Sequence, residues 1–321
     1  MPIRSSRVNL SVIIPLIALV IFLFVSPAFL SRYYLYLLSG IFIMTLFAYG
    51  FHLLFAYAGY ISFGHAAFYA VGAYTVALMY KHVGDSVWLA FLAALATSAI
   101  IGAIIGALSV RLGKIYFAFL TLGFGQLIYV VIFRWRSFTG GDDGIPGVMR
   151  GSLDFGFFQV SLEPLVNYYY FTLVIFLLCI FVIWRIVNSP FGYTLMSIRD
   201  NQERASFTGV NVLKYAWIAF VISSMVTGLA GALMVSLCGM AYPELSFWSS
   251  SADPILATLI GGVFTFSGPF VGSASYVLIK SYLMSTIGNW TIFMGAILLV
   301  LLLFFRSGIM GFFSQRFKVT L

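Results

Sequence analysis

The most polar segment of the chain groups four charged side chains between two long apolar stretches: Arg199, Asp200, Glu203 and Arg204. Charged residues make up only 8% of the protein, so such a group is conspicuous. The spacing Asp200-x-x-Glu203 is typical of a capping box, in which two side chains satisfy free backbone N–H groups at the start of a helix. We therefore expect residues 188–212 to form an ordered polar segment that docks a partner.

Residue types that start and stop helices divide this segment in two. Ser189 and Pro190 suit a helix start, with serine as the N-cap and proline at the first helical position. Gly209 suits the end of a second helix, because glycine readily takes the left-handed conformation found there. Two short helices joined near Asp200 would form a rigid, L-shaped projection on one side of a membrane.

No sequence pattern for nucleotide binding, metal binding or catalysis accompanies the polar segment. The nearest approach to a phosphate-binding loop, Gly113-Lys114, is followed by isoleucine where that loop needs serine or threonine. The three histidines, His52, His65 and His82, lack the spacing of metal ligands, and no nucleophile elbow or pair of intramembrane carboxylates occurs. We expect no cofactor, no bound metal and no enzymatic activity.

Composition places the chain in a membrane. Its 321 residues are 62% hydrophobic with a mean hydropathy of +1.06, whereas soluble domains are roughly 45–50% apolar. Apolar stretches recur along the whole length without the strict alternation of a membrane barrel. They predict an all-α polytopic membrane protein that forms a single domain over 1–321. The net charge of +8 is spread over loops and termini, which fits membrane orientation and not nucleic-acid binding.

We expect about ten membrane spans, within a range of about eight to ten. Their approximate bounds are 10–30, 33–55, 61–80, 87–110, 115–133, 163–187, 213–238, 253–266, 269–287 and 290–305. The segment 253–266 is too short to cross about 30 Å as one helix, so it is either a broken helix or a re-entrant segment. With both termini in the cytoplasm, most lysines and arginines fall on inner loops, as the positive-inside rule requires.

Two segments place serine, threonine and glycine beside a predicted helix break: Ile61-Ser-Phe-Gly-His-Ala-Ala-Phe68 and Gly261-Gly-Val-Phe-Thr-Phe-Ser-Gly-Pro-Phe270. Backbone groups freed at such breaks are tolerated only where they are buried in protein or line a cavity. The candidates for a translocation path are therefore Ser62, His65, Thr265 and Ser267. A loose similarity between the two segments also suggests that spans two to five and seven to ten form an inverted repeat.

Charged residues near the predicted spans leave two further questions open. Asp142 and Asp143, in the turn-rich stretch Thr139-Gly-Gly-Asp-Asp-Gly-Ile-Pro-Gly147, could dock a partner or bind a cation, although the glycines favour a tight turn. Lys280 lies within the ninth span and is either functional or reaches the membrane surface by snorkelling.

Because no acidic residue is clearly at mid-membrane, the sequence shows no group that would couple transport to protons or sodium ions. The energy for transport therefore enters from elsewhere, or the protein is a passive pore.

Four segments together resemble the permease subunits of branched-chain amino acid ABC importers, the LivM branch of the LivH/LivM family. They are residues 59–74, 135–147, 189–205 and 259–272, and the similarity extends over about residues 40–312. The resemblance implies a subunit embedded in the inner (plasma) membrane of a prokaryote. It also implies the partners of that subunit: a second, LivH-like permease, two cytoplasmic ATPase subunits and an extracytoplasmic solute-binding protein.

The resemblance gives the polar segment a role. Glu203-x-Ala205-x-x-x-Gly209 is similar to the Glu-Ala-Ala-x-x-x-Gly pattern by which such permeases contact their ATPase, with Arg204 in place of the first alanine. The residues that couple to the ATPase would be Arg199, Asp200, Glu203, Arg204, Ala205 and Gly209. Asp142 and Asp143 would dock the binding protein. A local capping role for Glu203 is compatible with this.

Several alternatives stay open. The family handles branched-chain and other apolar amino acids, and related systems take urea, amides or small aromatic acids. A stand-alone carrier or channel would move substrate through the purified chain without ATP. An intramembrane enzyme is disfavoured because the sequence shows no catalytic constellation.

Overall fold

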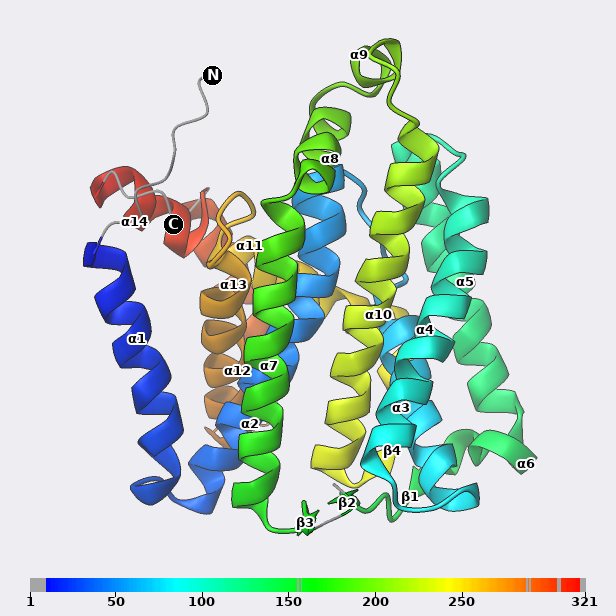
Figure 1. The fold of residues 1–321 in the computed structure, drawn as a ribbon, viewed down its shortest axis with the longest axis vertical. Helices are drawn as coiled ribbons and strands as arrows, with labels where there is room; N and C mark the ends of the chain where they lie inside the picture. Colours follow the sequence, from blue (N-terminus) through cyan, green and yellow to red (C-terminus); the bar gives the residue numbers. More distant parts are fainter. Residues whose placement is uncertain are drawn as a thin grey trace.

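A computed structural model describes residues 10–154, 156, 158–286, 288, 290–304 and 307–317. Most of its long helices run along one axis, with α8 and α9 at one end and short strands at the other (Figure 1). The longer helices are α1 (Leu10–Val25), α2 (Arg32–His52), α3 (His65–His82), α4 (Val87–Ser109), α5 (Lys114–Arg134), α7 (Leu165–Val187), α10 (Val212–Cys238), α12 (Gly268–Thr286) and α13 (Trp290–Phe304). The shorter ones are α6 (Arg136–Thr139), α8 (Pro190–Asp200), α9 (Gln202–Phe207), α11 (Ala252–Gly261) and α14 (Gly308–Phe317).

Five of the described helices are long and apolar enough to cross a membrane. They are α2 with its continuation to Ala58, α4, α5, α7 and α10, with lengths from 21 to 27 residues. These helices confirm the predicted all-α polytopic membrane fold. The described helices also occupy the other predicted spans, and the number of crossings stays a prediction.

The second and third predicted spans meet at a different place than expected. α2 continues as a π-helical segment, Leu53–Ala58, and α3 begins at His65 instead of residue 61. Gly59 ends the π-helix with φ at +75°, in the left-handed conformation that glycine tolerates. Residues 59–64 are therefore a non-helical connection and not the start of a span. π-Helical turns occur frequently at functional sites.

α2 and α10 lie at the centre of the bundle. In their most apolar stretches 78% of α2 and 67% of α10 are buried, against 28% of α5. α10 approaches α3 so closely that a Cβ added to Gly72 would meet the backbone carbonyl of Gly228. Because only glycine permits this contact between helix backbones, these two glycines allow α3 and α10 to pack closely.

The predicted break at 253–266 is a short helix followed by a loop. α11 has 10 residues, which corresponds to a length of about 15 Å. It packs against α12 closely enough that a Cβ on Gly272 would meet the Ala257 carbonyl. The loop 262–267 joins the two helices. An inverted repeat stays a prediction, although the segments that suggested it both contain interrupted helices.

Two small antiparallel sheets close the end of the bundle opposite α8 and α9 (Figure 1). β1 (Ile145–Pro146) pairs with β4 (Met240–Ala241), and β2 (Ser152–Asp154) pairs with β3 (Gln159–Ser161). The sheets therefore fold the long connection before α7 back over the helix ends.

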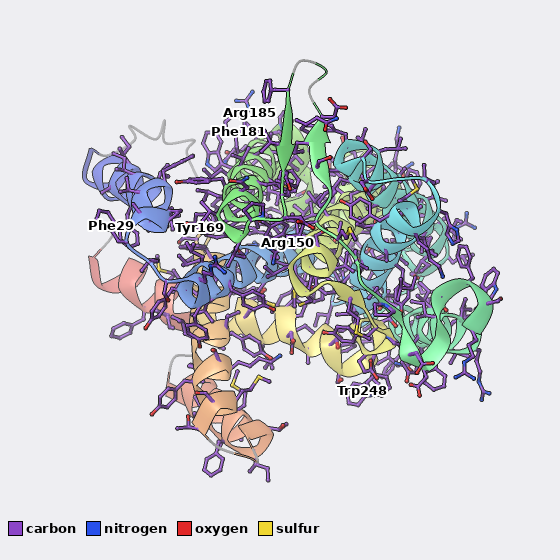
Figure 2. The ribbon with its side chains drawn as sticks, turned by 90° about the horizontal axis from the view of Figure 1, so that it is seen from below. Phe29, Arg150, Tyr169, Phe181, Arg185 and Trp248 are labelled. Carbon is purple, nitrogen blue, oxygen red and sulfur yellow. The ribbon has the colours of Figure 1, made fainter. Side chains whose placement is uncertain are left out.

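Arg150 connects the segment that contains these strands to the long helices. Its guanidinium donates to the Ser236 carbonyl at 3.3 Å and to the Glu163 carbonyl at 2.8 Å, and it lies over the Tyr168 ring. Figure 2, seen from this end, shows Arg150 next to α7 and α10. One basic side chain thus joins the connecting strands to two long helices.

Candidate functional site

α8 and α9 form the predicted projection between α7 and α10, at one end of the bundle (Figure 1). We call residues 188–212 the projection. Ser189 caps α8, because its Oγ accepts a hydrogen bond from the Gly192 N–H at 3.5 Å. Pro190 occupies the first helical position. The predicted helix start is confirmed.

The start of α9 differs from the prediction. Asn201, and not Asp200, caps α9, and its Oδ1 accepts from the Arg204 N–H at 2.9 Å. Asn201 has the extended backbone of an N-cap, whereas Asp200 is still the last residue of α8. The Asp200 carboxylate instead pairs with Arg199 at 3.0 Å. The predicted capping box of Asp200 and Glu203 was therefore wrong by one residue.

Not all of the residues predicted to contact the ATPase are exposed on α9 and its flanks. Gly209, with φ at +85°, follows the end of the helix as predicted. Ala205 is only 4% exposed and packs toward the base of the projection. Glu203 and Arg204 are exposed, and so is Phe207, at 88%. Sequence reasoning missed Phe207 because a lone phenylalanine gives no indication of which way it faces.

Arg199 faces the bundle and not the solvent. Its Nη1 donates to the Ala56 carbonyl at 2.7 Å, and 28% of its side chain is exposed. Ala56 lies in the last turn of the π-helix, where carbonyls have no partner further along the helix. The structure thus separates Arg199 and Ala205, which face inward, from Asp200, Glu203, Arg204 and Gly209, which are exposed.

Ser62 and His65 lie in the interior at the start of α3. His65 Nε2 lies 2.7 Å from Ser223 Oγ, and the Ser223 hydroxyl donates to the Gly50 carbonyl at 2.6 Å. Since that carbonyl can only accept, the Ser223 proton is used there and His65 must donate from Nε2. Ser62 is also buried, and its Oγ accepts from the Gly64 N–H at 3.4 Å. His65 therefore links α2, α3 and α10.

Thr265 and Ser267 lie in a separate place, in the loop 262–267. Thr265 donates to the Gly262 carbonyl at 3.0 Å. The buried Ser267 hydroxyl has no hydrogen-bond partner within the described part of the chain. Within the described residues, Thr265 bonds inside its own loop, whereas Ser62 and His65 bond at the start of α3 and to α10, so the four path candidates form two groups.

Two side chains of α2 hold the backbone of this loop. His52 Nε2 donates to the Val263 carbonyl at 2.7 Å, and the Tyr49 hydroxyl donates to the Phe266 carbonyl at 2.7 Å. These bonds satisfy backbone groups that the helix break leaves free. The loop is therefore anchored on α2.

Asp142 and Asp143 lie on the surface at the opposite end of the bundle. They belong to a 3₁₀ turn, Gly141–Asp143, next to Thr139, whose hydroxyl donates to the Ile132 carbonyl at 2.6 Å. Asp143 lies 3.3 Å from Arg136, and both side chains are more than three-quarters exposed. Both aspartates are thus accessible, in the tight turn that the glycines predicted.

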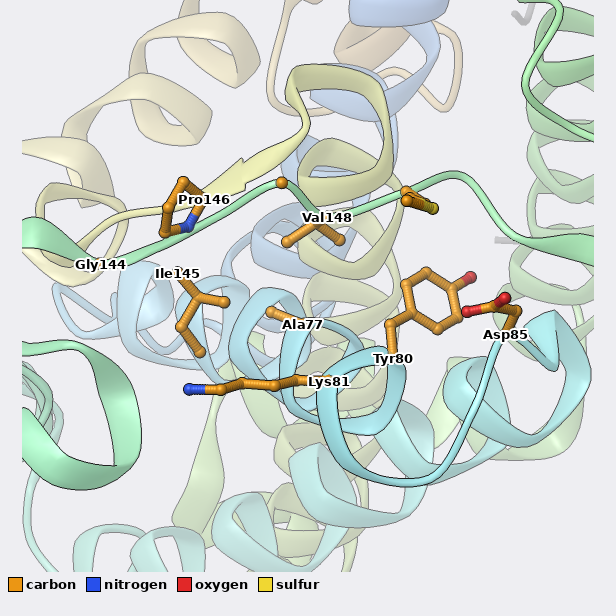
Figure 3. A pocket seen from close by; sticks show the side chains of 10 residues that line it. Ala77, Tyr80, Lys81, Asp85, Gly144, Ile145, Pro146 and Val148 are labelled. Carbon is orange, nitrogen blue, oxygen red and sulfur yellow. The ribbon is translucent and has the colours of Figure 1, made fainter.

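A pocket of about 360 Å³ lies beside this turn (Figure 3). Lys81 and Asp85 approach it from different sides, and Ile145 and Val148 contribute apolar side chains. Sequence reasoning missed this pocket, because its walls come from the end of α3 and from residues 144–149.

The structure also pairs two charges that the sequence left separate. Lys280 Nζ on α12 lies 3.3 Å from Asp253 Oδ2 on α11. The Tyr276 hydroxyl donates to Asp253 Oδ1 at 2.6 Å. Lys280 is therefore neither a lone functional cation nor a snorkelling residue but one half of an ion pair inside a helical hairpin.

The chemistry of these groups is that of binding and movement. In the described part of the chain, no three His, Cys, Asp or Glu residues are placed to hold a metal ion. What the chain offers is an exposed charged and aromatic helix at one end, interrupted helices inside, and a charged pocket at the other end. An apolar helical bundle with these features is typical of a membrane transport subunit.

The comparison with protein families supports this class. The chain belongs to the family described as "Branched-chain amino acid transport system / permease component", whose sequence model matches residues 33–304. This confirms the resemblance drawn from the four sequence segments. It also identifies the chain as a multi-pass membrane permease component.

Individual relatives agree with the family. Over 258 residues the chain is 27% identical to the high-affinity branched-chain amino acid transport system permease protein LivM of Salmonella typhimurium strain LT2 and 26% identical to LivM of Escherichia coli strain K12. Each match covers 74% of this chain and 60% of the relative, so the chain spans less than two thirds of the LivM length. The L-arabinose transport system permease protein AraH of Escherichia coli strain K12 is 30% identical over 112 residues, which are 35% of this chain and 33% of AraH. No solved structure matches the chain.

Proposed function

We propose that this chain is the permease subunit of an ABC importer for branched-chain or other apolar amino acids, with the whole chain acting as one transmembrane domain. Separate ATPase subunits supply the energy. Membership of the permease family supports the proposal, and the observation that carries it furthest is the exposed helix α9 on a structured projection. The assembled importer contains a second, LivH-like permease, two cytoplasmic ATPase subunits and an extracytoplasmic solute-binding protein.

Helix α9 is the part of the projection that contacts the ATPase. Phe207 supplies an aromatic anchor, since 88% of it is exposed. Buried aromatic side chains commonly carry much of the binding energy of a protein interface. Glu203 and Arg204 supply charges of both signs at the rim, where they favour one orientation of the partner.

The projection faces the cytoplasm. Basic residues gather on the helix ends and loops near it: Arg111, Lys114, Arg185, Arg199, Arg204 and Lys214. Such an excess marks the cytoplasmic side of a membrane protein. The start of α1 and the helix α14 lie toward the same end (Figure 1), which supports cytoplasmic N- and C-terminal segments.

The opposite end receives the solute-binding protein. Asp142 and Asp143 are exposed there, and the pocket with Lys81 and Asp85 lies beside them. This surface therefore offers a partner both charges and a recess. The substrate then passes along the two non-helical segments beside α2, the connection that contains Ser62 and the loop that contains Thr265 and Ser267. His65 maintains the geometry of that region through its bond to Ser223.

Capture of the tagged chain from its native membrane tests the proposal. Glu203→Lys and Phe207→Asp should lower the recovery of the ATPase subunits by at least about tenfold, because interface anchors typically contribute 2 kcal/mol or more. Glu163→Lys, an equal charge reversal at the opposite end, should leave recovery unchanged. Undiminished ATPase recovery with both projection variants would contradict the assignment of α9.

A further inference from the structure

Arg199 contacts both interrupted helices at once. Its Nη1 donates to the Ala56 carbonyl at the end of the π-helix of α2. Its guanidinium carbon lies 5.5 Å from the centre of the Phe264 ring in the loop 262–267. Arg199 itself lies near the end of α8, next to the start of α9. One side chain therefore joins the projection to two breaks in the membrane helices.

The bond to Ala56 is of a strong kind. A cation that donates to a free carbonyl at a helix C-terminus gains from the charge and from the helix dipole together. Gly59 lets the side chain reach this position, because a Cβ there would approach Arg199 Cγ to 2.9 Å. The Arg199 carbonyl also accepts from Lys114 Nζ at 3.2 Å. The elbow between α8 and α9 thus rests directly on the ends of α2 and α5.

A second contact prevents the elbow from turning on its own. Gln202 Nε2 donates to the Tyr60 hydroxyl at 2.9 Å, in the connection that follows the π-helix. The end of α8 and the start of α9 are therefore both bonded to residues 56–60. A tilt of the projection must displace this segment or break these bonds.

The loop 262–267 is held from three sides, one of which is the close backbone contact between Gly262 and Gly308 at the start of α14. His52 and Tyr49 bind its carbonyls from the membrane interior, and Arg199 stacks on Phe264 from the projection. The Phe264 ring is 82% exposed, so little besides this contact restrains its outer face. Movement of Arg199 therefore acts on the loop through the Phe264 ring.

We propose that Arg199 is a transmission residue and not a docking residue. It carries movement of the projection to the π-helical end of α2 and to the loop between α11 and α12, where the freed backbone borders the path. This rests on the proposed function, because the movement originates in the ATPase. It predicts that loss of Arg199 leaves the ATPase bound and active while the loop stops responding.

The test follows the loop in the assembled importer captured from its native membrane. A cysteine is introduced by Ser267→Cys in a background with Cys179→Ala and Cys238→Ser. Its maleimide labelling rate is compared between the nucleotide-free and the vanadate-trapped complex. We expect the two rates to differ by about tenfold, the scale of one charge-assisted hydrogen bond, and we expect Arg199→Gln to abolish the difference.

Two variants in the same background keep this test decisive. Phe264→Leu removes an exposed ring without a cavity and should reduce the difference to about two- to fivefold, the scale of an exposed cation–π contact. Arg185→Gln, at the end of α7, should leave it unchanged. ATP hydrolysis by the captured complex should stay within about twofold in all variants, since binding of the ATPase is retained.

The remaining outcomes distinguish failure of this inference from failure of the proposed function. A wild-type difference in labelling with Arg199→Gln overturns the transmission role, and so does a reference complex whose loop does not respond to nucleotide. Loss of the ATPase with Arg199→Gln would make Arg199 a docking residue and overturn the inference while supporting the proposed function. Absence of any ATPase from the reference complex would instead contradict the proposed function.

Discussion

Gly50 and His52 lie two residues apart on α2, and each holds one of the two helix interruptions. The Gly50 carbonyl accepts from Ser223, which in turn binds His65 at the start of α3. His52 donates to the Val263 carbonyl in the loop between α11 and α12. A single turn of α2 therefore fixes both irregular segments, which are distant in sequence.

Ser223 is the residue to change in order to separate a structural from a transport role of His65. Ser223→Ala should destabilise the solubilised protein by about 1–3 kcal/mol, because it leaves the buried Nε2–H of His65 without its hydrogen-bond partner. Thermal unfolding in detergent measures this, with Ser285→Ala as the control, since that exposed hydroxyl makes only a local bond to the Tyr282 carbonyl. Unchanged stability with an altered KM for uptake would instead place His65 in the path.

The close contact between α3 and α10 predicts a sharp difference between two glycines. Gly72→Ala should lower the yield of monodisperse protein and destabilise the fold by about 1–3 kcal/mol, because the added methyl meets the Gly228 backbone. Gly123→Ala on α5 should be neutral, because no described residue outside its own helix lies within 4 Å of the added Cβ. Size-exclusion chromatography and thermal unfolding of both variants provide the comparison. Equal behaviour of the two would show that the helices are not in backbone contact.

The ion pair between Asp253 and Lys280 should respond to charge reversal. Removal of one partner costs about 3–5 kcal/mol in a fully buried pair. A smaller loss is expected for Asp253→Asn, because the two side chains are 29% and 32% exposed. The double variant Asp253→Lys with Lys280→Asp should recover part of the loss in thermal stability. A double variant less stable than Asp253→Asn would argue against a direct electrostatic role.

The neighbouring residues Asp200 and Asn201 should contribute differently to the stability of α9. Asn201→Ala removes the acceptor of the Arg204 N–H and should cost about 0.5–2 kcal/mol of helix stability, which weakens ATPase recovery. Asp200→Ala removes only an ion pair whose carboxylate is 69% exposed, and its effect should be smaller. ATPase recovery with the captured chain ranks the two variants. The reverse order would show that the Asp200 carboxylate, and not the cap of α9, governs ATPase binding.

Local signals in the sequence predicted much of this fold. Apolar stretches located the long helices, and Ser189, Pro190 and Gly209 located the ends of the projection. The cap of α9 was placed one residue early because Asp200 and Asn201 are both good capping residues. In the structure Asp200 is still the last residue of α8, and Asn201, whose backbone is extended, is the residue whose side chain accepts from the start of α9.

Contacts between distant segments were beyond the sequence. Asp253 and Lys280 meet because α11 and α12 pack as a hairpin, and the break between them sets their register. Arg199 points inward because it bonds to the Ala56 carbonyl at the end of the π-helix. The wider turn of a π-helix changes the positions of Ala56 and Gly59 relative to a regular α-helix. No hydropathy pattern predicts such a shift. The same holds for the exposure of Phe207.

We infer that this chain moves substrate only when an ATPase drives it through the projection. Uptake of radiolabelled L-leucine into liposomes tests this directly, with the chain alone and with the complete importer captured from the native membrane, each with and without ATP. We predict uptake only by the complete importer with ATP, and its loss with Phe207→Asp. Leucine flux through the chain alone, without ATP, would contradict the account and identify a stand-alone carrier or channel.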